Sequence, residues 1–113
     1  MAELIGQADG ASLEVSESVE SDGTIVLKLS GELDLSTVPA LHPAMQDAIE
    51  RKPGALVFDL AELTFMDSSG IAALLSAVGA VDAVQVRNPS RIVRRIIELS
   101  GLAQTLGLPS AVD

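Results

Sequence analysis

The 113-residue chain contains no cysteine, and this absence excludes disulfide bonds, zinc thiolate sites, iron–sulfur clusters and thiol catalysis. It contains a single histidine, His42, which excludes a metal site built from several imidazoles. No apolar run approaches the roughly 20 residues that span a bilayer, and the N-terminus has neither the basic nor the apolar region of a secretory signal. We therefore expect a cytoplasmic protein that needs no cofactor and does not enter a membrane.

Basic residues are also scarce. Seven lysines and arginines face sixteen acidic residues, for a net charge of −9, which argues against nucleic acid as the main ligand. Six of the acids precede the first basic residue, Lys28: Glu3, Asp9, Glu14, Glu17, Glu20 and Asp22. This run is either a solvated tail with a soluble edge strand or a surface that recruits a basic partner.

Length and an apolar content of 48% predict one globular domain. Residues 1–11 show no hydrophobic period and are expected to form a flexible acidic arm, followed by the domain over 12–108 and a short tail over 109–113. Alternating or continuous apolar residues predict strands at 13–15, 24–33, 55–60 and 83–87. With helices between the later strands, the order predicts an α/β fold, a small mixed sheet of about four strands with helices mainly on one face.

Apolar spacings of three and four predict the three helices. The first is expected to be capped by Ser36 or Thr37 and closed by Arg51 and Lys52. The second follows Gly70, buries Val78 and ends at Gly79. The third is capped by Ser90 and is expected to bury Ile92, Val93, Ile96, Ile97 and Leu99.

The sequence lacks the residues that most common catalytic sites require. A serine hydrolase would have to use His42, and the sequence M-D-S-S-G around Ser68 and Ser69 is not the G-x-S-x-G elbow. A P-loop needs a lysine after a glycine-rich stretch, and neither Lys28 nor Lys52 has that setting.

The aspartates of the chain allow two further kinds of functional site to be considered. Asp34, Asp59 and Asp67 at strand ends could form a metal site. A receiver-type phospho-acceptor aspartate would need a lysine on a later strand, and no lysine follows Lys52.

The tetrapeptide Asp67-Ser68-Ser69-Gly70 precedes a predicted helix. Simple capping of the helix by Asp67 or Ser68 explains it. A serine at a helix N-terminus is also a favourable phosphorylation site, because the positive end of the helix and its free N–H groups stabilise the negative charge of the phosphate.

With its flanks, the tetrapeptide resembles a known signature. The segment Leu56–Leu75, LVFDLAELTFMDSSGIAALL, resembles the STAS domain and, more narrowly, bacterial anti-sigma factor antagonists. Three further stretches match in order: Leu29–Asp34 (LSGELD), Asn88–Ser90 (NPS) and Val93–Leu102 (VRRIIELSGL). The resemblance covers about residues 12–108.

The resemblance implies a non-catalytic switch. An unphosphorylated antagonist binds an anti-sigma factor that is itself a GHKL-type serine kinase, which frees the sigma factor. The kinase then phosphorylates the antagonist, and a PP2C-type phosphatase restores it. By this resemblance Ser68 is the phospho-acceptor, Asp67, Ser69 and Gly70 complete its setting, and Asp34 lies at the partner surface.

The chain departs from the family pattern between Gly70 and Pro89, which is shorter than usual by about one and a half helical turns. The stretch from Val78 to Val84 is mostly apolar, which favours self-association, and we expect a monomer or a weak dimer. Within the same fold, the alternative is a scaffold or accessory subunit of a stressosome or a lipid-transport complex without a phospho-switch.

Overall fold

The computed structural model describes residues 12–109. The predicted arm (1–11) and residues 110–113 of the predicted tail lie outside the described residues. The elements follow in the order β1 (Leu13–Val19), β2 (Ile25–Leu33), α2 (Val38–Glu50), β3 (Leu56–Met66), α3 (Ser68–Leu75), β4 (Val84–Arg87) and α4 (Arg91–Leu99).

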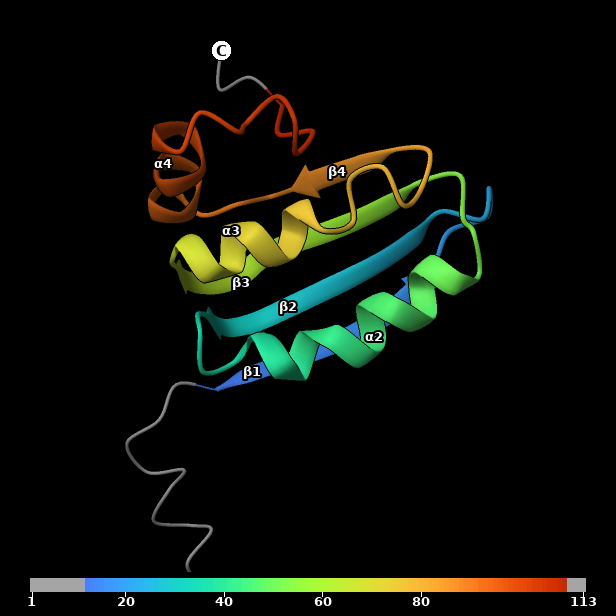
Figure 1. The fold of residues 1–113 in the computed structure, drawn as a ribbon, viewed down its shortest axis with the longest axis horizontal. Coiled ribbons are helices and arrows are strands. Elements are labelled where there is room, and N and C mark those ends of the chain that lie inside the picture. The colour runs from blue at the N-terminus through green and yellow to red at the C-terminus, as the bar shows by residue number, and fades with distance from the viewer. Residues whose placement is uncertain (1–11, 110–113) are drawn as a thin grey trace, which may run out of the picture.

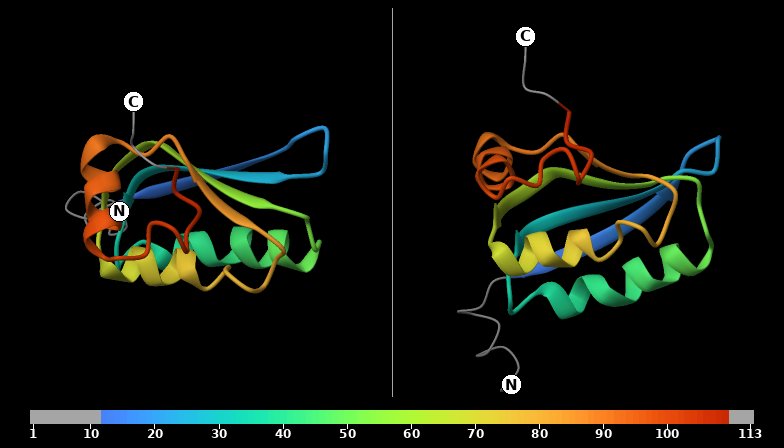
Figure 2. Two further views of the ribbon diagram at one scale, coloured as in Figure 1. Left: turned by 90° about the horizontal axis from the view of Figure 1, so that it is seen from above. Right: turned by 45° about the horizontal axis from the view of Figure 1, so that its top comes forward.

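The four strands form one mixed sheet in the order β1-β2-β3-β4. β1 and β2 are an antiparallel hairpin, whereas β2–β3 and β3–β4 are parallel pairs joined by helical crossovers. α2 and α3 lie side by side on one face of the sheet, and α4 lies near the end of β4 (Figure 1). The two further views show the same arrangement of layers (Figure 2). The predicted fold class is confirmed.

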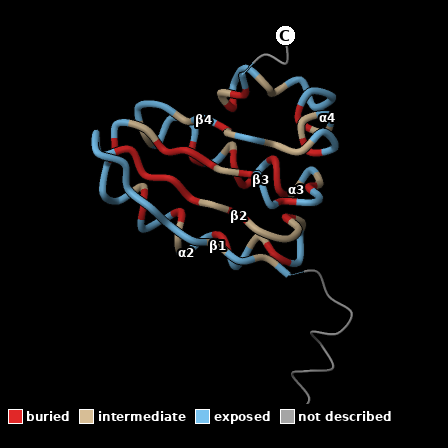
Figure 3. Tube along the Cα trace, turned by 180° about the vertical axis from the view of Figure 1, so that it is seen from behind, coloured by how far each residue is buried: buried red, intermediate tan, exposed pale blue. Residues whose placement is uncertain are grey.

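The core lies between the sheet and its helices. Alternate residues of β2 point into it, as its period of two predicts. β3 is buried over most of its first half, where it pairs with β2 along one edge and with β4 along the other (Figure 3). The fully buried large side chains are Phe58, Leu27, Leu29, Leu33, Leu41, Met45, Leu56, Leu60, Leu63, Met66, Leu74 and Ile97.

The two edge strands of the sheet, β1 and β4, differ in what lies on their outer side. Residue Gly107 lies against β4, because its carbonyl accepts a hydrogen bond from the backbone N–H of Val86 (3.3 Å). β1 has no strand on its outer side within residues 12–109, and it carries Glu14 and Glu17. Charged side chains on an open edge discourage pairing with another chain.

Two strands are longer than the sequence predicts. β1 continues to Val19 because its backbone stays paired with β2, although its later side chains are exposed and lose the apolar alternation. β3 continues to Met66, and register shifts near Ser30 and Gly31 keep it paired with β2. Pairing in the sheet, rather than side-chain pattern, sets these lengths.

The second helix is shorter than predicted. α3 ends at Leu75, and the next N–H groups bond three residues back, from Ala77 to Leu74 (3.1 Å) and from Val78 to Leu75 (2.9 Å). The last turn therefore tightens, and Val78 is 38% exposed rather than buried. The prediction that this helix runs to Gly79 is wrong.

The ends of α2 also differ. The helix stops at Glu50, so Arg51 and Lys52 lie beyond it. The Arg51 guanidinium pairs with Glu17 of β1 and with Asp47 (2.9 Å), which fastens the end of α2 to the edge strand.

The third helix buries fewer residues than predicted. Val93 and Ile97 are buried and Ile96 is half-buried, but Ile92 and Leu99 are exposed. α4 contacts the sheet through one side only, so a flank of the helix that is apolar in sequence remains uncovered. Among residues 12–109, no helix is both long and apolar enough to cross a bilayer.

Candidate functional site

The candidate site lies where β2 and β3 end and the chain turns into α2 and α3. Leu33 pairs with Met66 at the ends of these parallel strands. Asp34 and Asp67 are the first residues after these two strands. The sheet register therefore places both predicted aspartates at one end of the sheet.

Asp67 caps α3. Its backbone is extended, and its carboxylate accepts a hydrogen bond from the N–H of Gly70 (3.1 Å). Of the two caps that the sequence allows, Asp67 is the one formed. Ser68 is therefore the first residue of the helix. Its side chain is exposed, and no hydrogen bond within residues 12–109 involves its hydroxyl.

Gly70 brings the start of α3 against the end of β2. A Cβ added there would lie 2.8 Å from the carbonyl oxygen of Leu33 and 2.8 Å from Cγ of Met66. The backbone N–H of Asp67 donates to the same Leu33 carbonyl (3.2 Å). Contacts of Asp67 and Gly70 thus hold the backbone on both sides of Ser68, and the Ser68 side chain remains exposed.

Asp34 organises the neighbouring loop. Its carboxylate accepts hydrogen bonds from the Ser36 hydroxyl (2.7 Å), the Ser36 N–H (2.9 Å) and the Thr37 N–H (3.2 Å). The hydrogen bond from the Ser36 hydroxyl is the main cause that holds the pKa of Asp34 below its usual value. Desolvation opposes it, and the backbone N–H bonds of Ser36 and Thr37 lower the pKa further. The loop projects Leu35, which is 75% exposed.

The first helix, α2, was expected to be capped by the side chain of Ser36 or Thr37, and the buried Thr37 does not form that cap. It occupies the N-cap position, but its side chain makes no capping bond. Its hydroxyl instead donates to the carbonyl of Glu32 (2.8 Å) and accepts from the N–H of Asp34 (2.9 Å). Thr37 therefore fixes the loop that carries Asp34 and Leu35.

A groove of about 410 Å³ runs between α2 and α3 from this end of the sheet. The lining residues are largely apolar or small: Leu35, Val38, Pro39, His42, Ser69, Ala72, Ala73 and Ser76. This groove was not among the features predicted from the sequence. Its signal was the run of small residues at spacings of three and four on α3, which leaves room between the helices.

His42 is exposed on α2, and both it and Ser69 line the groove. Within residues 12–109 no hydrogen bond joins the side chains of His42 and Ser69. The serine–histidine hydrogen bond that activates a serine nucleophile is therefore not formed by this pair. The three aspartates of the metal alternative do not gather either. Asp59 accepts from the N–H of Ala61 (3.1 Å), and residues 12–109 hold no cluster of three potential ligands.

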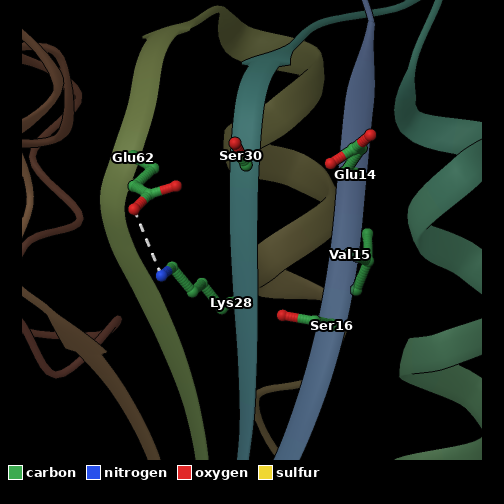
Figure 4. A pocket seen from close by; sticks show the side chains of 6 residues that line it. All are labelled: Glu14, Val15, Ser16, Lys28, Ser30 and Glu62. Atoms are coloured by element: carbon green, nitrogen blue, oxygen red, sulfur yellow. Dashed lines mark ion pairs between the residues drawn. The ribbon is translucent and has the colours of Figure 1, made fainter.

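The opposite face of the sheet has a second hollow, also of about 410 Å³. Figure 4 shows Lys28 of β2 reaching toward Glu62 of β3, with Glu14, Ser16 and Ser30 nearby. The Lys28–Glu62 ion pair (3.2 Å) is largely solvated on both sides. Such a pair contributes little, and we assign no chemistry to this hollow.

Several known proteins are similar to this chain over most of its length. A family model described as "Mlab, STAS domain" matches residues 16–109. The anti-sigma-F factor antagonist RsfB of Mycobacterium tuberculosis is 34% identical over 96 residues, which cover 82% of this chain and 79% of that protein.

Solved structures agree. An anti-sigma factor antagonist from Mycobacterium paratuberculosis superposes with a TM-score of 0.78 at 28% identity, over 88% of this chain and 87% of that one. SpoIIAA, a Bacillus cell fate determinant, has been solved unphosphorylated (TM-score 0.67, 84% of that chain) and phosphorylated (TM-score 0.60, 86% of that chain). Both forms are 26% identical to this chain over 80% of its length.

Proposed function

Since the chain belongs to the STAS domain family and its relatives are anti-sigma factor antagonists, we propose that it binds a cognate anti-sigma factor and so releases a sigma factor. The binding surface is the end of the sheet that carries Asp34, Leu35 and Ser68, together with the groove between α2 and α3. An exposed leucine beside an apolar groove offers the desolvated centre that a protein interface needs, and the two aspartates favour a basic partner face.

Ser68 is the switch in this proposal. The observation that carries it is an exposed hydroxyl, free of hydrogen bonds within residues 12–109, at the first position of a helix capped by its neighbour. A phosphate there would meet the positive end of α3, so the fold can keep its shape while the surface charge changes.

The transfer is an ordinary serine phosphorylation. The Ser68 Oγ attacks the γ-phosphorus of ATP, the bond to ADP breaks, and the hydroxyl proton passes to a base of the kinase. The kinase is the GHKL-type anti-sigma factor itself, and a PP2C-type phosphatase hydrolyses the phosphoserine with water. The added charge of about −1.5 to −2 lies at the proposed interface, where its desolvation and its repulsion by nearby acids weaken the complex. The protein itself performs no catalysis in this scheme.

The test is labelling with the anti-sigma factor and ATP, followed by mapping of the phosphate and binding curves. Ser68→Ala should fold and bind the anti-sigma factor but accept no phosphate. Ser69→Ala is the matched control and should be labelled. Ser68→Asp should bind more weakly than the unmodified protein, though less so than the phosphorylated one, since it adds only one charge.

Phosphate found on Ser69 would overturn the residue assignment. Full-strength binding by the phosphorylated protein would overturn the switch. The family model that matches is described as "Mlab", so a STAS subunit without a phospho-switch is the second candidate. It predicts no labelling of either serine.

A further inference from the structure

The outer flank of α4 combines exposed aliphatic side chains with cations. Ile92 is 54% exposed and Leu99 is 73% exposed. They lie two helical turns apart, with the half-buried Ile96 between them at spacings of four and three, so the three form a continuous ridge. An aliphatic ridge that remains in contact with water marks a surface suited to a partner.

Two arginines lie next to this ridge. Arg91 and Arg95 are four residues apart, and neither belongs to any of the five ion pairs within residues 12–109. Arg94, in contrast, is held by the Pro109 carbonyl (2.8 Å) and by Glu98 (3.6 Å). A shallow hollow of about 630 Å³ lies among these residues, lined by Arg91, Ile92, Arg94, Arg95 and Glu98.

The charge of this helix is opposite to that of the rest of the chain. Three arginines and one glutamate give α4 a net charge of +2, in a protein whose net charge is −9. The surface formed by Arg91, Ile92, Arg95 and Leu99, which we call the α4 strip, is therefore a basic and aliphatic island in an acidic molecule. It shares no residue with the groove between α2 and α3.

We propose that the α4 strip is a second docking surface, which binds an acidic amphipathic helix of a partner protein. The aliphatic side chains of that helix pack against Ile92 and Leu99, as rows of side chains do between crossing helices. Its carboxylates pair with Arg91 and Arg95, whose planar guanidinium groups bind carboxylates in a bidentate way.

Charge decides among the possible occupants. A second copy bound through the same strip would bring two sets of arginines together, which costs binding energy. An anionic bilayer would attract the strip but repel the acidic remainder of the molecule. An acidic segment of a protein contacts the strip alone, so it gains the attraction without that repulsion.

The test uses the full chain and two synthetic helical peptides of about 18 residues, or five turns. One carries a row of leucines flanked by glutamates, and the other has lysine in place of each glutamate. Binding is measured by fluorescence anisotropy and located by NMR shift changes. We expect the glutamate peptide alone to bind, with shifts confined to residues 91–99.

Paired variants then separate the two components of the strip. The double variants R91A/R95A and I92S/L99S should each weaken binding of the glutamate peptide by about tenfold or more. The controls are Lys52→Ala, which removes a cation elsewhere, and Val78→Ser, which removes another exposed aliphatic side chain. Both controls should bind normally, and circular dichroism should show that all variants are folded.

Several results would overturn the proposal. These are equal binding of the lysine peptide, no binding of the glutamate peptide at millimolar concentration, or shifts that map to α2 and α3. A dimer that I92S/L99S abolishes would assign the strip to a second copy. Binding to phosphatidylserine vesicles without binding to the peptide would assign it to a membrane. None of these measurements uses an anti-sigma factor or Ser68, so failure here is separate from failure of the proposed function.

Discussion

The backbone N–H of Asp67 donates a hydrogen bond to the carbonyl of Leu33 (3.2 Å), which joins the start of α3 to the end of β2. The oxygen of the same carbonyl would lie 2.8 Å from a Cβ added at Gly70. These contacts, more than any side-chain bond of Ser68, determine where the serine hydroxyl is presented. The geometry of the proposed switch therefore depends on tight backbone packing, which substitutions can test.

Gly70→Ala should destabilise the fold. Its Cβ would lie 2.8 Å from backbone oxygen, so α3 must shift away from β2. We expect a loss of about 1–3 kcal/mol in the free energy of unfolding, measured by urea denaturation. Gly54→Ala is the matched control, because nothing lies within 4 Å of the added Cβ, and it should be neutral or slightly stabilising. Equal effects of the two substitutions would contradict this packing argument.

Acid should weaken the Asp34 loop. The carboxyl pKa is lowered in the folded protein, from a reference value of 3.8, by its bonds to Ser36 and Thr37. A lowered folded pKa adds stability above the unfolded pKa, and that stability is lost as pH falls through the folded value. Asp34→Asn should therefore flatten the pH dependence of the unfolding midpoint at the acidic end, below about pH 4. Parallel curves for the two proteins would show that Asp34 does not contribute.

Filling the groove between α2 and α3 should block the proposed partner. Ala72 is exposed and lines the groove, so Ala72→Leu adds bulk there and should change folding stability by no more than about 0.5 kcal/mol. Binding to the anti-sigma factor should weaken about tenfold, or 1.4 kcal/mol, in a titration.

The control for this experiment is Gln46→Leu, which adds the same side chain at an exposed position of α2 outside the groove. Its binding should be unchanged. If both variants bind as the unmodified protein does, the groove lies outside the interface.

Salt should slow association with the anti-sigma factor. The net charge of −9 attracts a basic partner face over distances that ions screen, about 10 Å at 0.1 M salt. The association rate measured by stopped-flow fluorescence should fall as sodium chloride is raised, while the dissociation rate changes less. An association rate that is independent of salt would make the acidic charge incidental to recognition.

Much of the fold could be predicted from particular residues. The element order follows from the alternation in β2, the apolar run from Leu56 and the spacing in α4. The sequence allowed Asp67 or Ser68 as the cap of α3, and the structure forms the cap with Asp67. The resemblance pointed to Ser68, which the structure presents on the surface. The match of several separate segments, rather than the tetrapeptide alone, carried the family assignment.

Other features depend on tertiary contacts that a pattern does not contain. α3 stops at Leu75 because its last turn tightens, and nothing in the apolar spacing marks that change. Ile92 and Leu99 have the right spacing for burial, but the sheet covers only one side of their helix. The carboxylate of Asp34 accepts hydrogen bonds within a loop that the buried Thr37 holds in shape. The role of Asp34 in organising this loop could therefore not be predicted from the sequence.

The asymmetric edges of the sheet limit how copies of this protein can join. A ribbon that lengthens by backbone pairing needs two free edges in every subunit. Here Gly107 occupies the hydrogen-bonding side of β4 at Val86, which leaves β1 as the one open edge among the described residues. Pairing of two β1 strands would consume both open edges at once. Growth by that route ends at a pair, so the folded domain is protected from fibril formation by its topology as well as by its glutamates.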